Sequence, residues 1–325
     1  MKNKLSLIIP CYNEQEVLHQ TANVLLDKLN FLIANKKISP ESKIIFIDDG
    51  SEDKTWEIIQ ALNSQNKIFW GIKLSRNFGH QNALLCGLMT AKNFFDITIS
   101  IDADLQDDIN LIDLMLEKYF LGGNQIVYGV RDSRKSDSFF KKITAECFYK
   151  LLKFLGADII FNHADFRLMS KKVLDEYEKF PEVNLFLRGT VKMLGFKSCI
   201  LKYERKKRLA GKSKYNLKKM MILAWDGITS TSIKPIRFIT AFGFFVAWIS
   251  FFTFFAYPFF ITKMHYDPCN DYNITVLYHL IVLYNPAFFF LGLLFVAVGI
   301  VGEYVAKTYL ETKQRPKFII EDFLN

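Results

Sequence analysis

The chain has 325 residues, of which 50% are hydrophobic, and its formal net charge at pH 7 is +9. This length accommodates one large domain, or a medium-sized domain with an appendage. The five cysteines are scattered, odd in number and without a CxxC pair. They therefore indicate neither a disulfide framework nor a zinc site, and a reducing cytosol suits them.

Strand-like and helical patterns alternate through the N-terminal part of the chain. Short apolar, β-rich runs predict strands at 5–9, 44–47, 69–74, 97–101 and 125–130. Apolar residues at near-helical spacing predict helices at 14–32, 53–62, 81–92 and 110–120. This alternation is typical of an α/β domain with a mainly parallel central sheet and helices on both faces. Such sheets bind ligands at the carboxyl ends of their strands, so we expect a site in the segments that follow the strands.

Every predicted strand ends in a polar string. These strings are PCYNE at 10–14, DDGS at 48–51, SRNFGH at 75–80, DADLQ at 102–106 and GVRDSR at 129–134. Any one of them could be an ordinary polar turn, but five strings at one edge of a sheet predict a site. The chain has no GxGxxG fingerprint for a dinucleotide and no GxxxxGK[ST] loop for an NTPase.

Asp102 and Asp104 are the sharpest feature among these strings. In extended backbone, side chains two residues apart point to the same side. Two carboxylates that project together can hold Mg²⁺ or Mn²⁺ and leave coordination positions for phosphate oxygens. The metal would then neutralise a diphosphate leaving group. The alternative is a solvated turn in which an Asp caps the next helix, but a position at the end of a buried central strand favours the metal site.

The remaining strings indicate contacts to a nucleotide and its phosphates. Asp49 would accept hydrogen bonds from a base or a ribose, although DDGS is also a good turn sequence. Tyr12 would stack on the base, and a purely structural role for this ring fits the pattern equally well. Arg131 and Arg134 would pair with phosphate oxygens, or else form ion pairs within their own loop. His80 is first a polar loop residue and second a substrate contact.

The C-terminal part of the chain is apolar and rich in Phe. Stretches 236–262 and 274–304 are each long enough to cross about 30 Å of hydrocarbon as a helix. Lys and Arg gather outside both stretches rather than in the connector between them, so the positive-inside rule places both flanks in the cytoplasm. The same placement of charge favours anionic lipid or a lipid phosphate over nucleic acid as the partner. A buried core helix is the alternative for each stretch.

These patterns predict a multi-pass protein of the cell (inner) membrane with both termini in the cytoplasm. The predicted parts are a cytoplasmic α/β domain at 1–204, a basic juxtamembrane segment at 205–235, transmembrane helices at 236–262 and 274–304, an extracytoplasmic loop at 263–273 and a cytoplasmic tail at 305–325. Gly292, Gly299 and Gly302 would permit close helix packing between the subunits of a homo-oligomer.

Taken in order, the strings resemble the family-2 inverting glycosyltransferases of the GT-A fold. The closest resemblance is to their polyprenyl-phosphate branch, which includes the bactoprenol glucosyltransferases and the dolichyl-phosphate mannose synthases. The matching strings are IIPCYNE at 8–14, IDDGS at 47–51, LSRNFG at 74–79, IDADLQ at 101–106, YGVR at 128–131, DFRLM at 165–169, GKSKY at 211–215, GIVGEY at 299–304 and KQRP at 313–316. The resemblance covers nearly the whole chain, including the two predicted spans.

The resemblance implies that residues 1–204 form a GT-A catalytic domain and gives roles to residues in it. The implied nucleotide-sugar residues are Pro10, Tyr12, Glu14, Asp49, Asp102, Ala103, Asp104 and Arg131, with Arg134 as a second phosphate contact. Asp102, Asp104 and Gln106 would bind Mg²⁺ or Mn²⁺. Asp104 and Asp165 would be catalytic, and Asp165 matches the Asp that acts as the base or positions the acceptor.

Phosphate chemistry narrows the role of Asp165. A phosphate monoester has a second pKa of about 6, so the acceptor is mostly dianionic at neutral pH and needs little deprotonation. We therefore expect Asp165 to orient the acceptor or to stabilise charge at the anomeric carbon. Basic residues of the juxtamembrane segment would guide the lipid phosphate, or else adhere to anionic headgroups. The residues expected to guide it are Arg205, Lys206, Arg208 and Lys214.

The sequence thus predicts inverting transfer of a hexose from a UDP-sugar to undecaprenyl phosphate at the cytoplasmic membrane face, for cell-envelope glycosylation. Glucose and N-acetylglucosamine are both open as the sugar, because strings 80–81, 107–110 and 162–164 depart from the usual pattern of the branch. One alternative is a GDP-mannose-dependent polyprenyl-phosphate mannosyltransferase. Another is a membrane-anchored module that binds a nucleotide without turnover. A processive polysaccharide synthase is disfavoured, because the chain lacks a QxxRW string.

Overall fold

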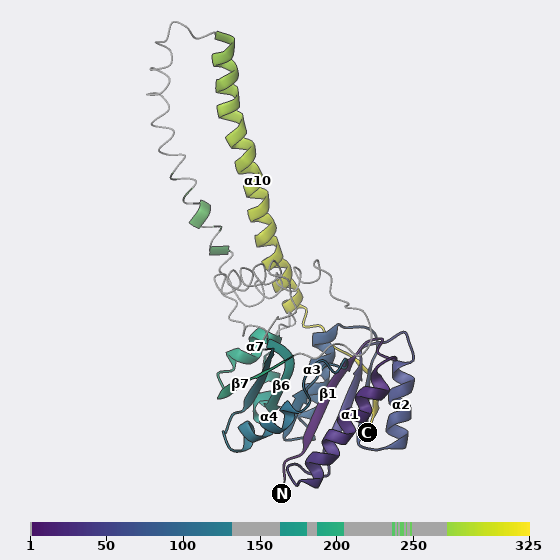
Figure 1. Ribbon diagram of the computed structural model, residues 1–325. Helices are drawn as coiled ribbons and strands as arrows, with labels where there is room; N and C mark the ends of the chain where they lie inside the picture. The colour runs from purple at the N-terminus through teal and green to yellow at the C-terminus, as the bar shows by residue number, and fades with distance from the viewer. Residues whose placement is uncertain are drawn as a thin grey trace. The chain divides into compact units, whose positions relative to one another are not determined.

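The computed structural model describes residues 2–131, 163–180, 187–204 and 272–325, together with separate helical positions between 236 and 248. The chain divides into two units. One consists of Met1–Thr231 with Lys313–Asn325, and the other of Ser232–Thr312. Figure 1 shows the helices and strands of both units.

The first unit is built on one eight-stranded sheet with the strand order β7-β5-β6-β4-β1-β2-β3-β8. Its strands are β1 (Leu5–Cys11), β2 (Lys43–Asp48), β3 (Phe69–Leu74), β4 (Ile97–Ser100), β5 (Ile126–Arg131), β6 (His163–Ser170), β7 (Ser198–Tyr203) and β8 (Ile320–Leu324). Only β6 and β8 run against the other described strands. The prediction of a mainly parallel sheet is confirmed, and the carboxyl ends of the five predicted strands meet at one edge.

Helices cover both faces of this sheet, as predicted. One face carries α1 (Leu18–Ala34), α2 (Thr55–Gln65) and α4 (Leu111–Phe120), and the other carries α3 (His80–Ala91), α6 (Lys171–Glu178) and α7 (Leu187–Met193). In β1, Leu7 and Ile9 belong to the core under the first set, and Ile8 belongs to the core under the second. Successive side chains of a strand point to opposite faces, so a strand between two helical layers must be apolar throughout.

The second unit contains α10 (Tyr272–Thr312), a helix of 41 residues. Within it, Leu293–Thr312 is long and apolar enough to cross a membrane, and it is the one such stretch among the described residues. The second predicted span, 274–304, lies inside α10. Most of the first span, 236–262, and of the connector, 263–273, lies outside the described residues. A pair of transmembrane helices therefore stays a prediction.

The predicted tail, 305–325, contributes to both units. Its first residues continue α10, and its last ones join the sheet as β8, antiparallel to β3. The ring of Phe323 meets the ring of Trp70 edge-on, with centroids 5.6 Å apart. Leu324 packs against the core on the opposite face of the sheet. The sequence pattern did not indicate β8, which covers the edge of β3.

Candidate active site

The first two polar strings lie side by side at the carboxyl edge. Pro10 is buried within β1, and Tyr12 and Glu14 beyond it are half-buried. The backbone N–H of Glu14 donates to Thr55 Oγ1 at 2.9 Å, which ties the loop after β1 to the start of α2. The structure thus brings three of the residues predicted to bind the nucleotide close to the loop after β2.

Asp49 is 2% exposed and holds the loop between β3 and α3. Its Oδ1 accepts the backbone N–H of Phe78 at 2.7 Å, and its Oδ2 accepts that of Gly79 at 3.0 Å. Burial raises the pKa of Asp49, while the two backbone donors oppose that rise. Both carboxylate oxygens therefore already bind protein. Contact between Asp49 and a nucleotide stays a prediction, and the anchoring of this loop is a role that the sequence did not reveal.

Two glycines allow the loops after β2 and β3 to approach each other. Gly50 has a φ of +64°, and a Cβ at this position would lie 2.5 Å from the carbonyl carbon of Arg76. Gly79, which precedes the first residue of α3, has a φ of +89° and open space around it. At Gly50 both the positive φ and the lack of room for a Cβ favour glycine. At Gly79 only the positive φ does.

Residues 102–106, the string DADLQ, form a turn directly after β4 at the carboxyl edge of the sheet. Ala103 is 6% exposed, and its carbonyl oxygen accepts a hydrogen bond from Thr21 Oγ1 at 2.7 Å, so α1 anchors the turn. Asp102 and Asp104 on either side are half-buried. Leu105 has a φ of +50°, in the left-handed region that residues other than glycine rarely adopt. Strained backbone of this kind is concentrated at functional sites.

The register of β4 and β6 brings Asp165 to this turn. Ser100 pairs with Arg167 in an antiparallel ladder, and continuing that register sets Asp165 across from Asp102. Ser100 Oγ also donates a hydrogen bond to the backbone carbonyl of Asp165. Asp165 is 7% exposed, and its Oδ1 lies 3.7 Å from Nη2 of Arg167. Two carboxylates far apart in the sequence are therefore neighbours in the fold.

His80, the first residue of α3, lies between these carboxylates. Its Nε2 is 3.3 Å from Oδ2 of Asp165 and 3.8 Å from Oδ1 of Asp102. The imidazole is 36% exposed, whereas the side chain of Asp165 is 9% exposed. His80 thus faces both solvent and the two acidic groups, which places it within the site rather than in a loop beside it.

Negative charge accumulates around Asp102. Burial raises its pKa to about 6; His80 opposes this rise, and the nearby carboxylates of Asp107, Asp165 and Asp104 add to it. Tyr203 donates a hydrogen bond to Oδ1 of Asp107, which holds that carboxylate in place. A cation bound here would relieve the mutual repulsion of the acidic groups.

The donor set suits a hard divalent cation whose remaining ligands come from a substrate. Asp102 and Asp104 would supply carboxylate oxygens, and Gln106, which is 5% exposed, would supply an amide two residues further along. Among the described residues, no group of three or more His, Cys, Asp or Glu side chains could hold a metal ion. A cation bound by Asp102 and Asp104 would therefore need further oxygen ligands, and a diphosphate can provide them.

Several predicted residues lie wholly or partly outside the part of the chain that the structure describes. The backbone of Arg131 ends β5 and pairs with Tyr203 of β7. The side chain of Arg131 lies outside the described part, as do the remaining basic residues that were predicted to contact phosphates, namely Arg134, Arg205, Lys206, Arg208 and Lys214. Their roles stay predictions.

Arg167 was missed by sequence reasoning, although a signal for it existed. It is fully buried, and it donates from Nη1 to the carbonyl oxygen of Leu187 at 3.3 Å while its Nη2 lies near Asp165. In the string DFRLM, residues 165 and 167 are two apart, which puts both side chains on one face of a strand. The position of Arg167 beside a candidate catalytic Asp follows from that spacing once 165–169 is taken as a strand.

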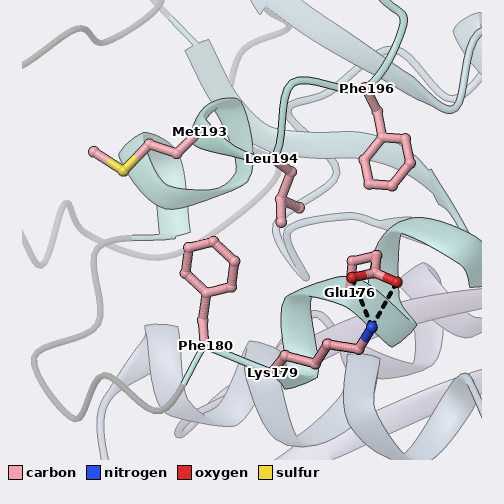
Figure 2. A pocket seen from close by; sticks show the side chains of 6 residues that line it. All are labelled: Glu176, Lys179, Phe180, Met193, Leu194 and Phe196. Carbon is pink, nitrogen blue, oxygen red and sulfur yellow. Dashed lines mark hydrogen bonds and ion pairs between the residues drawn. The ribbon is translucent and has the colours of Figure 1, made fainter.

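Two cavities lie away from this site. One, of about 490 Å³, lies near α6 and α7. Figure 2 shows the side chains that line it, which are Glu176, Lys179, Phe180, Met193, Leu194 and Phe196. A second, also of about 490 Å³, is lined by residues at the opposite edge of the sheet, among them Lys4, Asp96 and Lys171. Among the residues that the structure describes, none that was predicted to bind substrate lines either cavity.

Residues 6–178 match the sequence profile of the family described as glycosyl transferase family 2. A protein of Bacillus subtilis, the uncharacterized glycosyltransferase YkoT, is 48% identical over 317 residues, which cover 98% of this chain and 91% of that protein. The bactoprenol glucosyl transferase of Shigella phage SfV is 36% identical over 324 residues, which cover 98% of both chains. The profile spans more than half of the chain. Both relatives align with this chain over almost its whole length.

Proposed function

This chain belongs to glycosyltransferase family 2, and we propose that it transfers a hexose from a UDP-sugar to a polyprenyl phosphate with inversion at the anomeric carbon. The observation that carries this proposal is the juxtaposition of Asp102 and Asp165 at the carboxyl edge of a GT-A-like sheet. In this proposal Asp102 serves the donor diphosphate and Asp165 serves the acceptor. The full-length similarity to a bactoprenol glucosyl transferase supports a lipid acceptor.

On the donor side, the loops after β1, β2 and β4 would hold the nucleotide-sugar. Tyr12 and Glu14 would contact the base end of the nucleotide, and Asp102, Asp104 and Gln106 would hold Mg²⁺ or Mn²⁺ for the diphosphate. When bound, the metal supplies positive charge that stabilises the departing diphosphate. Arg131, at the end of β5, and Arg134 would add charge-assisted hydrogen bonds to the phosphates.

On the acceptor side, Asp165 orients the lipid phosphate. One phosphate oxygen attacks the anomeric carbon, and the bond from that carbon to the β-phosphate oxygen breaks on the opposite face, which inverts the configuration. The acceptor is already mostly dianionic, because its second pKa is about 6, so no proton has to leave it. The products are a lipid-linked sugar phosphodiester and UDP. Asp165 therefore acts through position and electrostatics rather than as an obligatory base.

In our proposal the C-terminal part of the chain anchors the enzyme in the membrane that contains its lipid acceptor. Leu293–Thr312 is a candidate membrane span, and a second span at 236–262 would bring both flanks to the cytoplasmic face. In this arrangement undecaprenyl phosphate is the acceptor, and the guiding cations are Arg205, Lys206, Arg208 and Lys214. These cations would attract the phosphate of a lipid that remains anchored in the membrane.

The test uses the purified full-length chain with undecaprenyl phosphate, Mn²⁺ and radiolabelled UDP-glucose, UDP-N-acetylglucosamine or GDP-mannose. We expect one UDP-sugar to give labelled lipid whose anomeric configuration, read by NMR, is opposite to that of the donor. Asp102→Asn should abolish the product while the melting temperature stays close to wild type, and His19→Ala, an exposed histidine on α1, should change neither. Product from GDP-mannose alone would refute the UDP assignment. Binding of nucleotide without any lipid product would refute transfer.

A further inference from the structure

His80 has a fixed place in the fold although it sits at the end of a loop. The two residues before it are held by the carboxylate of Asp49, through the backbone N–H groups of Phe78 and Gly79. The backbone N–H of Ala83 donates to the carbonyl oxygen of Gly79 at 3.1 Å, which starts α3 at His80. The imidazole therefore lies at the N-terminus of α3, and the buried carboxylate of Asp49 fixes the backbone that leads into this helix.

From this position His80 meets one side of Asp165. Its Nε2 lies 3.3 Å from Oδ2, while Nη2 of Arg167 lies 3.7 Å from Oδ1. The two partners differ in burial, because the side chain of Arg167 is 0% exposed and that of His80 is 36% exposed. Asp165 is thus held from the interior by a guanidinium and from the open side of the site by an imidazole.

We infer that His80 is a positioning residue that keeps the Asp165 carboxylate turned toward the acceptor. This inference rests on the proposed function. Removal of the imidazole takes one partner away from Oδ2 and leaves the attraction of Arg167 for Oδ1, which draws the carboxylate toward the interior of the domain. His80 contacts Asp102 as well, but at the longer distance of 3.8 Å. The shorter contact assigns it to the acceptor side of the reaction.

The contact with Asp165 requires an N–H donor at the position of Nε2, which a glutamine can also provide. His80→Ala removes the donor, and His80→Gln keeps it without an imidazole. A displacement of about 1 Å in a catalytic group costs on the order of 100-fold in rate. We therefore expect kcat of His80→Ala to fall on the order of 100-fold, while KM for the nucleotide-sugar stays unchanged. His80→Gln should recover most of the lost rate.

A double-mutant cycle with Asp165→Asn tests whether His80 acts through Asp165. If it does, adding His80→Ala to Asp165→Asn produces little further loss, because the group that His80 positions has already been changed. All variants are assayed in the full-length enzyme. The Mn²⁺ concentration for half-maximal activity and the melting temperature are measured beside kcat, with His19→Ala as the matched control. We expect both quantities to match wild type in His80→Ala.

Three results would overturn the inference while leaving the proposed function intact. They are an unchanged kcat in His80→Ala, a full additional loss in the Asp165→Asn background, and a defect that excess Mn²⁺ restores. The last would assign His80 to Asp102 and the donor side. A wild-type enzyme that made no lipid-linked sugar would instead refute the proposed function, and this inference with it.

Discussion

The close approach of the loops after β2 and β3 can be tested by adding a single methyl group. Gly50→Ala puts a Cβ 2.5 Å from the carbonyl carbon of Arg76 and 2.6 Å from the backbone nitrogen of Asn77. Gly123, in the turn before β5, has the same φ of +64°, but a Cβ added there would meet nothing within 4 Å. Gly123→Ala is therefore a matched control, since the two substitutions share the backbone cost and differ in the contact.

The expected loss in the free energy of unfolding is the sum of a backbone term and a steric term. An L-residue in the left-handed region costs about 1–2 kcal/mol, and both variants incur it. Forcing a methyl group into filled space costs about 1–3 kcal/mol more, and only Gly50→Ala incurs that term. The free energy of unfolding should thus fall by about 2–5 kcal/mol in Gly50→Ala and by about 1–2 kcal/mol in Gly123→Ala.

Melting of the full-length protein in detergent, followed by tryptophan fluorescence, measures the difference. For a domain of this size about 1 kcal/mol corresponds to 2–4 °C, so Gly50→Ala should melt on the order of 5 °C below Gly123→Ala. At a temperature where both are folded, Gly50→Ala should also raise KM for the nucleotide-sugar, because the displaced backbone leads to the loop that Asp49 anchors. Equal melting temperatures and equal KM values would show that the two loops do not touch as described.

Three further outcomes are expected. The pKa of Asp102 is raised to about 6, and the protonated acid cannot bind a metal. Acidification below that value should therefore weaken Mn²⁺ binding by about tenfold per pH unit, measured by electron paramagnetic resonance with UDP present; affinity that is level from pH 7 to pH 5 would contradict this. Asp165→Asn should reduce kcat less than Asp102→Asn does and leave the acid limb of the pH–rate profile unchanged, whereas loss of a limb would indicate base catalysis. Phe323→Ala should destabilise β8 by about 2 kcal/mol, less than the 3–5 kcal/mol of a fully buried Phe, and hydrogen exchange in β8 should quicken more than in an Ile320→Ala control.

Much of the sheet was predictable because its pattern is local. The run 69–74 coincides with β3, and the predicted helix at 110–120 differs from α4 by one residue at its start. These elements contain the apolar spacing that defines them, and each is buried by neighbours that impose the same period. The edge at which the polar strings meet followed from that alternation alone.

The contacts inside the site were not predictable in the same way. The pairing of Asp102 with Asp165 depends on the register of β4 and β6, which are distant in sequence. The position of His80 depends on hydrogen bonds that Asp49 makes to backbone, and backbone partners leave no residue signature. β8 was missed because its first three residues are exposed and two of them are acidic, which is typical of a solvated tail.

The strand β8 has a consequence for how the protein is made. It follows α10 in the chain, so a ribosome must translate the long apolar helix before it can deliver the strand that covers β3. Until then the growing domain carries an open strand edge, and such edges recruit other chains. The nascent enzyme therefore stays prone to aggregation until β8 itself has left the ribosome, and a shortened chain that stops before α10 would keep that vulnerability permanently.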